Sequence, residues 1–315
     1  MATQTPVSTV PSRRAVLFPG QGVQQPGMGE PWRAAESWQL VDTVSAASGH
    51  DVAELLLTAD AEALARTDRA QISVFTASLL AWSEFQRQQP DAPVVALAGH
   101  SLGEFTALVA AGALSVADGA WLVGERGRAM AEAARQQPGA MAAVIGGSAE
   151  EVAELVAAVR EKGEELWVAN YNSPQQTVVA GSHAAVDVLG ALTTGTDLRS
   201  RVLPVTAACH SPYMEPAGAV LCEALLLTRF AAGTLPVVAN VDALPHAGGS
   251  HWRDLSARQL TSPVRWVETL TTLHEGLGCT DFLDMGPGRT LSSLARRALP
   301  GVPAAAYAHT ADPAG

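Results

Sequence analysis

The chain has 315 residues, enough for one large α/β domain or for a large domain that carries a smaller one. It contains no apolar run of about 18 residues, so we expect no membrane span. Its net charge of −11 argues against non-specific binding of nucleic acid. Three scattered cysteines without metal-ligand spacing indicate reduced thiols and no metal site; they are Cys209, Cys222 and Cys279.

The first residues are polar, include two prolines and lack the apolar segment of a signal peptide. We therefore predict a disordered leader over residues 1–12 of a cytoplasmic protein. Short apolar runs follow, and they alternate with long helical patterns, as in a parallel sheet covered on both faces. The predicted strands are residues 15–18, 94–98, 237–241 and 281–285, and a helix is predicted from 102 to about 113.

The middle of the chain has a different order of elements. A strand at 141–145 precedes a helix that Ser148 can cap, with Glu151 completing a capping box. Further strands are predicted at 166–170, 176–180 and 201–205, with a helix at 182–192. This β-α-β-β-α-β order is that of a ferredoxin-like unit. We expect a small domain over 138–205, inserted into a larger α/β domain made of 13–137 and 206–315.

A possible nucleophile lies in the segment Gly-His-Ser-Leu-Gly at 99–103. It fits the nucleophile elbow, Gly-x-Ser-x-Gly, and it stands between a predicted strand and a predicted helix, as that motif requires. The helix start would direct backbone N–H groups at charge that develops on a substrate there. The alternative is a glycine turn that carries an inert Ser101.

A nucleophilic serine needs a base, and the chain has eight histidines. His210 follows the predicted small domain, at the return to the large one, where it could overhang a cleft. A surface histidine is the alternative interpretation. We expect His100, next to the serine, to pack beneath the elbow.

Taken together, these segments resemble the malonyl-coenzyme A:acyl carrier protein transacylases and the related acyltransferases of polyketide synthases. The resemblance covers residues 14 to 300 approximately and depends on separate motifs in a fixed order. They are Phe-Pro-Gly-Gln-Gly at 18–22, Gly-His-Ser-Leu-Gly-Glu at 99–104, Arg126-Gly127 with Met130, Gly-Ala-Met-Ala-Ala at 139–143, Asn-Tyr-Asn-Ser-Pro at 170–174, His210, Ser-Pro-Val-Arg-Trp at 262–266 and Gly-Pro-Gly at 286–288. The resemblance implies an α/β-hydrolase-like large domain with an inserted ferredoxin-like small domain.

The resemblance also implies a role for individual residues. Ser101 would be the nucleophile and His210 its general base, oriented by the backbone carbonyl of Gln259. The backbone N–H groups of Gln21 and Leu102 would form the oxyanion hole. Two further positions concern the acyl group. Arg126 would pair with a malonyl carboxylate through two parallel hydrogen bonds. Gln71 resembles a glutamine of the family's pocket, although Ile72 replaces the proline that usually follows it.

The resemblance leaves the substrate open. Leu102 is the residue of malonyl-selective relatives, whereas Cys209 stands where malonyl-selective polyketide acyltransferases usually have a bulky Phe, so a branched extender such as methylmalonyl or ethylmalonyl could fit. We favour malonyl; the pathway, fatty-acid or polyketide synthesis, stays open. A Ser–His pair also serves esterases, and Arg126 favours transfer. A non-catalytic docking subunit for a carrier protein is the remaining alternative.

The expected substrates are malonyl-coenzyme A and the phosphopantetheine thiol of an acyl carrier protein, with no permanently bound cofactor. We expect a monomer that binds neither nucleic acid nor membrane. The carrier proteins of this family are acidic, so a negatively charged enzyme needs a local basic patch to bind one. The candidate docking residues are Arg199, Arg201, Arg289, Arg296 and Arg297.

Overall fold

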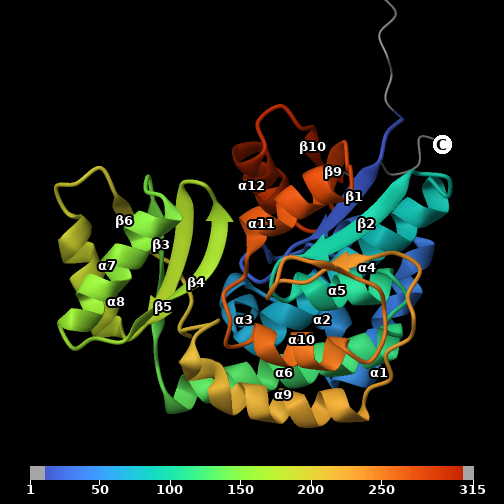
Figure 1. The fold of residues 1–315 in the computed structure, drawn as a ribbon. Helices are drawn as coiled ribbons and strands as arrows, with labels where there is room; N and C mark the ends of the chain where they lie inside the picture. Colours follow the sequence, from blue (N-terminus) through green and yellow to red (C-terminus); the bar gives the residue numbers. More distant parts are fainter. Residues whose placement is uncertain (1–10, 308–315) are drawn as a thin grey trace, which may run out of the picture.

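The structure, a computed structural model, describes residues 11–307. Residues 1–10 of the predicted leader lie outside the described residues. Two β-sheets form the framework, and Figure 1 shows them side by side, each with its own helices. No helix of the described part is long and apolar enough to cross a membrane.

The larger sheet has six strands in the order β10-β9-β1-β2-β7-β8. β1 pairs in parallel with β2 and β9, β7 in parallel with β2, and β10 in parallel with β9, while β8 runs antiparallel to β7. The strands are β1 (Arg14–Phe18), β2 (Val94–Gly99), β7 (Val237–Val238), β8 (Pro245–His246), β9 (Asp281–Asp284) and β10 (Ala304–Ala306). The strand predicted at 237–241 has only two residues, because the chain turns after them and Ala239 N–H donates to the Leu244 carbonyl.

Side chains of this sheet alternate between two separate cores. Ala15 and Leu17 of β1 pack with α11 (Trp266–Thr271) and α12 (Thr290–Ala298), whereas Val16 and Phe18 face the opposite core. That alternation is the period-2 pattern of a strand buried on both faces. The opposite core takes in α4 (Thr67–Gln88), α5 (Gly103–Ala110), α6 (Val116–Gln136), α1 (Leu40–Ser48), α2 (Val52–Leu57), α3 (Ala61–Ala65), α9 (Glu215–Leu227) and α10 (Trp252–Gln259). Short helices at Glu30–Trp32, Glu36–Gln39, Pro212–Met214 and Thr272–Gly276 complete this domain.

The smaller sheet is antiparallel, in the order β4-β5-β3-β6. Its elements are β3 (Ala140–Ile145), α7 (Ala149–Glu161), β4 (Leu166–Ser173), β5 (Gln176–Gly181), α8 (His183–Thr193) and β6 (Arg199–Val202). Both hydrogen bonds of the predicted capping box between Ser148 and Glu151 are present. β6 begins two residues earlier than predicted and ends three residues earlier. The order of elements and strands confirms the ferredoxin-like unit.

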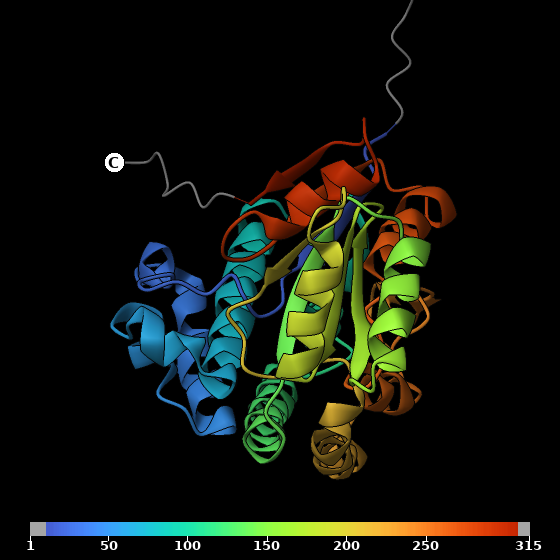
Figure 2. The ribbon, with the colours of Figure 1, turned by 90° about the vertical axis from the view of Figure 1, so that its left-hand side faces the viewer.

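The two sheets meet where the large sheet's parallel strands end. β4 contacts α11 and α12, and it is joined to the large domain by backbone bonds from Tyr171 N–H to the Val264 carbonyl and from Val264 N–H to the Ala169 carbonyl, both 2.9 Å long. Figure 2 shows α12 lying above the small sheet, with the large domain behind it. α7 and α8 cover one face of the small sheet, and Met141 and Ala143 on its other face join the core of the large domain. The predicted fold class, an α/β-hydrolase-like domain with an inserted ferredoxin-like one, is confirmed.

Candidate active site

Ser101 lies on a sharp turn between β2 and α5, in a backbone conformation with φ of +52°. Non-glycine residues seldom adopt this left-handed region, and such strain often marks a functional position. Both glycines of the motif are required by packing. A Cβ on Gly99 would lie 1.9 Å from the Gly103 backbone, and one on Gly103 would lie 2.0 Å from the carbonyl oxygen of Phe18. The turn can be this tight because its two ends carry no side chains.

His210, which follows the small domain in the sequence, lies beside this serine in the structure. Ser101 Oγ and His210 Nε2 are 2.8 Å apart, and His210 Nδ1 is 2.8 Å from the backbone carbonyl oxygen of Gln259. A carbonyl can only accept, so Nδ1 carries the proton and Nε2 is free to accept from the serine hydroxyl. Burial, followed by the nearby charge of Arg126, lowers the pKa of His210 to about 3. The imidazole is therefore neutral at physiological pH, as a general base must be.

Arg126, on α6, lies beside the same hydroxyl and is only 1% exposed. Its Nη2 donates to Ser101 Oγ at 3.2 Å and to the Gln259 side-chain oxygen at 3.0 Å, and its Nη1 donates to the Gln71 side-chain oxygen at 2.5 Å. The Nε atom is buried without a partner. Burial lowers the pKa of Arg126 to about 10, so the guanidinium is still charged at neutral pH. A buried cation thus stands within reach of any group attached to Ser101.

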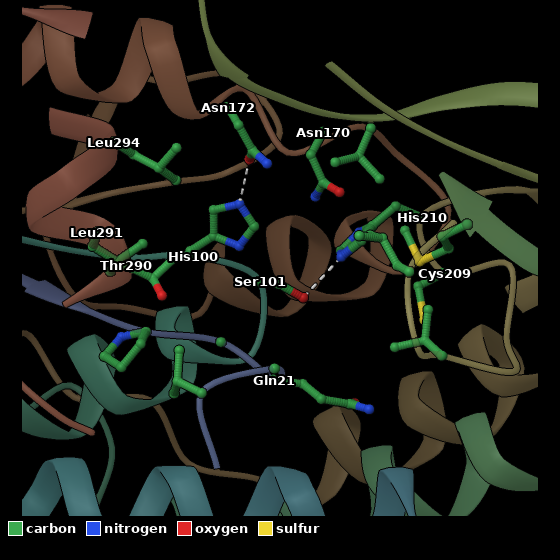
Figure 3. Close-up of a pocket in the computed structure, with 18 of the residues that line it drawn as sticks. Gln21, His100, Ser101, Asn170, Asn172, Cys209, His210, Thr290, Leu291 and Leu294 are labelled. Carbon is green, nitrogen blue, oxygen red and sulfur yellow. Dashed lines mark hydrogen bonds between the residues drawn. The ribbon is translucent and has the colours of Figure 1, made fainter. Parts of the chain in front are cut away.

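Figure 3 shows the pocket around Ser101, with α12 on one side and His210 and Cys209 on the other. His100 lines this pocket and does not pack beneath the elbow, so that expectation was wrong. The reason is its partners: Nε2 lies 2.8 Å from Asn172 Oδ1 on β4, and its ring packs edge-on against Trp266. Much of the remaining lining is apolar: Met130, Met141, Val178, Leu203, Val205, Leu291 and Leu294.

The other predicted pocket residues lie near the nucleophile. Cys209 lines the pocket, and burial raises the pKa of its thiol to about 11, so it stays protonated. Gln21 follows β1, and its side chain turns towards Thr67 and away from Ser101 (Figure 3). Leu102 is buried at the start of α5, where backbone N–H groups lack partners within the helix. Gln71 contacts Arg126 and Met130.

Two polar side chains beneath the elbow were not predicted. Asn240 Oδ1 accepts the Ser101 N–H at 2.7 Å, and Asn240 Nδ2 donates to the Gly99 carbonyl at 2.7 Å. Glu104 accepts from the Asn240 backbone and from the Gln259 side chain, and burial raises its pKa to about 8. Glu104 could have been found as the acidic residue in the first turn after the elbow. No local pattern marks Asn240, because the partners of its side chain are more than 130 residues away in the sequence.

The candidate docking arginines divide into two groups. Arg199 and Arg201 are exposed on β6, opposite Ile145 and Ala143 of β3. Arg289, directly before α12, and Arg297, on α12, are also exposed. The expectation that Arg296 flanks the cleft was wrong. It donates to the Ala304 carbonyl of β10 at 2.6 Å, on the side of α12 opposite Leu291 and Leu294. Within residues 11–307, no cluster of three or more His, Cys, Asp or Glu side chains could hold a metal ion.

Comparison with known proteins agrees with this geometry. Residues 16–305 match the family described as "Acyl transferase domain". The chain is 38% identical over 288 residues to the malonyl CoA-acyl carrier protein transacylase of Escherichia coli K12, covering 90% of this chain and 92% of that protein. The chain belongs to this transacylase family. The Bacillus subtilis transacylase is 35% identical over 291 residues, with 91% of this chain and 90% of that protein covered.

Solved structures of this transacylase family have the same fold. The Xanthomonas oryzae malonyl-CoA:acyl carrier protein transacylase has a TM-score of 0.89 at 37% identity, with 96% of each chain covered. A malonyl-transacylase of a type II polyketide synthase, solved in complex with its acyl carrier protein, has a TM-score of 0.88 at 34% identity, with 95% of this chain and 97% of that chain covered. As a member of this family the chain is an acyltransferase.

Proposed function

We propose that this acyltransferase moves a malonyl group from malonyl-coenzyme A to the phosphopantetheine thiol of an acyl carrier protein, through an ester on Ser101. The observation that carries the proposal is the buried Arg126 guanidinium, 3.2 Å from the Ser101 hydroxyl. A guanidinium holds a carboxylate by two parallel hydrogen bonds. It therefore selects acyl groups with a free carboxylate, and the malonyl transacylases that this chain resembles agree with that selection.

In the first half-reaction, Ser101 Oγ attacks the thioester carbonyl and its proton passes to His210 Nε2. The backbone N–H groups of Gln21 and Leu102 stabilise the oxyanion. As the C–S bond breaks, His210 returns the proton to the coenzyme A sulfur. In the second half, the carrier thiol gives its proton to His210 and attacks the Ser101 ester, and the serine leaves with that proton. One base thus serves both halves of a ping-pong cycle.

The pocket also suits a second candidate substrate class, malonyl groups that carry a branch. Cys209, next to the base, is small, and much of the pocket that it lines is apolar. A methyl or ethyl branch on the malonyl carbon would contact such a surface favourably. Arg126 and Gln71 would bind the carboxylate that both classes share, so they do not separate them. Malonyl stays the preferred substrate because Leu102 is the residue found in malonyl-selective relatives.

The remaining parts of the proposal concern the whole chain. We place the junctions of the small domain at residues 138 and 205, and we propose a monomer that needs no bound cofactor. All three cysteines are free, which suits the reducing cytoplasm. Fatty-acid and polyketide pathways both use this transfer, and relatives from both are similar to this chain.

The test is intact-mass analysis of the protein after exposure to equal amounts of malonyl-, methylmalonyl-, ethylmalonyl- and acetyl-coenzyme A. Wild type should gain mainly the malonyl mass, and added carrier protein should remove it. Ser101→Ala should gain none and keep its melting temperature, because the hydroxyl adds little packing. A base-labile malonyl adduct on Ser101→Ala would show that another residue is the nucleophile, and a predominant branched adduct would favour the second substrate class.

A further inference from the structure

Glu104 is a buried acidic side chain that does not line the pocket but contacts two residues that hold the site, Asn240 and Gln259. It lies in the first turn of α5, next to the elbow, and is 1% exposed. Its Oε2 accepts the backbone N–H of Asn240 at 2.6 Å, and its Oε1 accepts from Gln259 Nε2 at 2.8 Å. Both oxygens therefore act as acceptors towards groups that position the reacting residues.

The Gln259 amide has one orientation that suits all its neighbours. Its Oε1 accepts from Arg126 Nη2, and its Nε2 donates to both Ser101 O, at 2.9 Å, and Glu104. The backbone carbonyl of Gln259 accepts from His210 Nδ1. A side-chain amide could also turn its NH₂ group towards Arg126, where two donors would face each other. Turned that way, the amide would lose the hydrogen bonds that its NH₂ group donates to Ser101 O and to Glu104 Oε1.

Asn240 connects Glu104 to the turn that carries Ser101. Its side chain bonds both the Ser101 N–H and the Gly99 carbonyl, on the two sides of the turn. Its own backbone N–H is held by Glu104. The left-handed conformation of Ser101 thus depends on a side chain whose backbone is fixed by this carboxylate.

We propose that Glu104 is a positioning residue: by accepting from Gln259 and Asn240, it orients Arg126 towards the acyl carboxylate and holds the Ser101 turn. The inference rests on the proposed function, since it concerns how that site recognises a carboxylated acyl group. It also gives a role to the Gln259 amide, which bridges two ionisable side chains that are almost fully buried, Arg126 and Glu104.

Glu104→Gln tests this with little change in shape. The new amide can still accept from Asn240 N–H, but its NH₂ group then faces the NH₂ group of Gln259. Relief requires the Gln259 amide to flip, which places its NH₂ group against Arg126 and removes an acceptor from the guanidinium. We expect the ratio of malonyl to acetyl acylation rates to fall about tenfold or more, because a hydrogen bond to a charged group is lost.

Glu84→Gln is the matched control. Glu84 is also 1% exposed and accepts a backbone N–H, from Ser37, but it lies on α4 away from the pocket. Its variant should keep the wild-type ratio even if its melting temperature falls. The double variant Glu104→Gln with Gln259→Glu has an acceptor beside Arg126 again. The amide at position 104 can then donate to the carboxylate at position 259. The double variant should recover part of the ratio.

The outcomes separate the two proposals. If wild type forms no malonyl ester on Ser101, the proposed function fails. If wild type does, and folded Glu104→Gln keeps the wild-type ratio, Glu104 has no positioning role. Should Glu104→Gln not fold, Gln259→Glu alone is compared with the double variant. In the single variant two carboxyl groups face each other without an N–H donor between them, so a higher ratio in the double variant supports the role, and an equal or lower ratio overturns it.

Discussion

At the scale of single residues, the charge of Arg126 acts on two neighbours at once. It faces the hydroxyl that would carry the acyl group, and it is the second largest cause, after burial, of the low pKa of His210. A base whose pKa is lowered stays neutral until the pH falls through that low value. We therefore expect wild-type acylation to show no loss from His210 between about pH 5 and 7.

Arg126→Ala should change both selectivity and pH dependence. A malonyl carboxylate would be left unpaired in a buried pocket, at a cost of about 2–5 kcal/mol by analogy with buried charge pairs at interfaces, while acetyl has no charge to lose. The pKa of His210 should also rise. As the pH is lowered, acetyl transfer by the variant should therefore be lost at a higher pH than acetyl transfer by wild type. Initial acylation rates with both thioesters, measured from about pH 4.5 to 8, test both effects. An unchanged malonyl-to-acetyl preference would refute the carboxylate contact.

At the scale of elements, the site depends on the close approach of β1, the elbow and α5. Gly103, the first residue of α5, faces the Phe18 carbonyl of β1, and Gly20 faces the His100 carbonyl across the same contact. Neither neighbour is the flexible end of a side chain, so an added methyl group must displace backbone. The position of Ser101 is thus set by glycines in two separate segments.

Gly103→Ala should destabilise the protein by about 3 kcal/mol and abolish acylation, because overpacking against backbone shifts the elbow. Gly218→Ala is the matched control, since Gly218 lies in α9 with no atom within 4 Å of an added Cβ. That variant should gain about 0.5–1 kcal/mol from the higher helix propensity of alanine. Urea unfolding and acylation assays on both variants provide the comparison. Equal effects of the two substitutions would contradict the packing argument.

Local sequence patterns predicted most strands of this fold, a few of its helices and part of the site. The strand and helix that flank the elbow, and the capping box of α7, were found because their signals lie within a few residues. The environment of Ser101 was harder to predict: Asn240 and the side chain of Gln259 reach it from 139 and 158 residues away in the sequence. Arg296 was misplaced because a basic residue on a helix gives no indication of which face it occupies until the helix is packed.

At the scale of the whole molecule, a chain of net charge −11 would have to bind an acidic carrier protein. Exposed arginines on either side of the pocket could reverse the sign locally. Leu203 and Val205 line the pocket just after β6, and Arg199 and Arg201 precede them at the alternating positions that share one face of a strand. On α12, Arg297 follows the pocket residue Leu294 by three residues and so lies near its face.

Arg297→Glu should raise the KM for the carrier protein and flatten its salt dependence, because a cation near the opening becomes an anion that repels the acidic partner. The KM for malonyl-coenzyme A should change less, since the acyl group is held deeper, at Arg126. Arg296→Glu changes the net charge equally but lies on the other side of α12, beside β10. It should therefore leave carrier-protein kinetics close to wild type. Steady-state rates at several salt concentrations compare the two variants, and equal increases in KM would indicate that overall charge, not a patch beside the pocket, governs binding of the carrier protein.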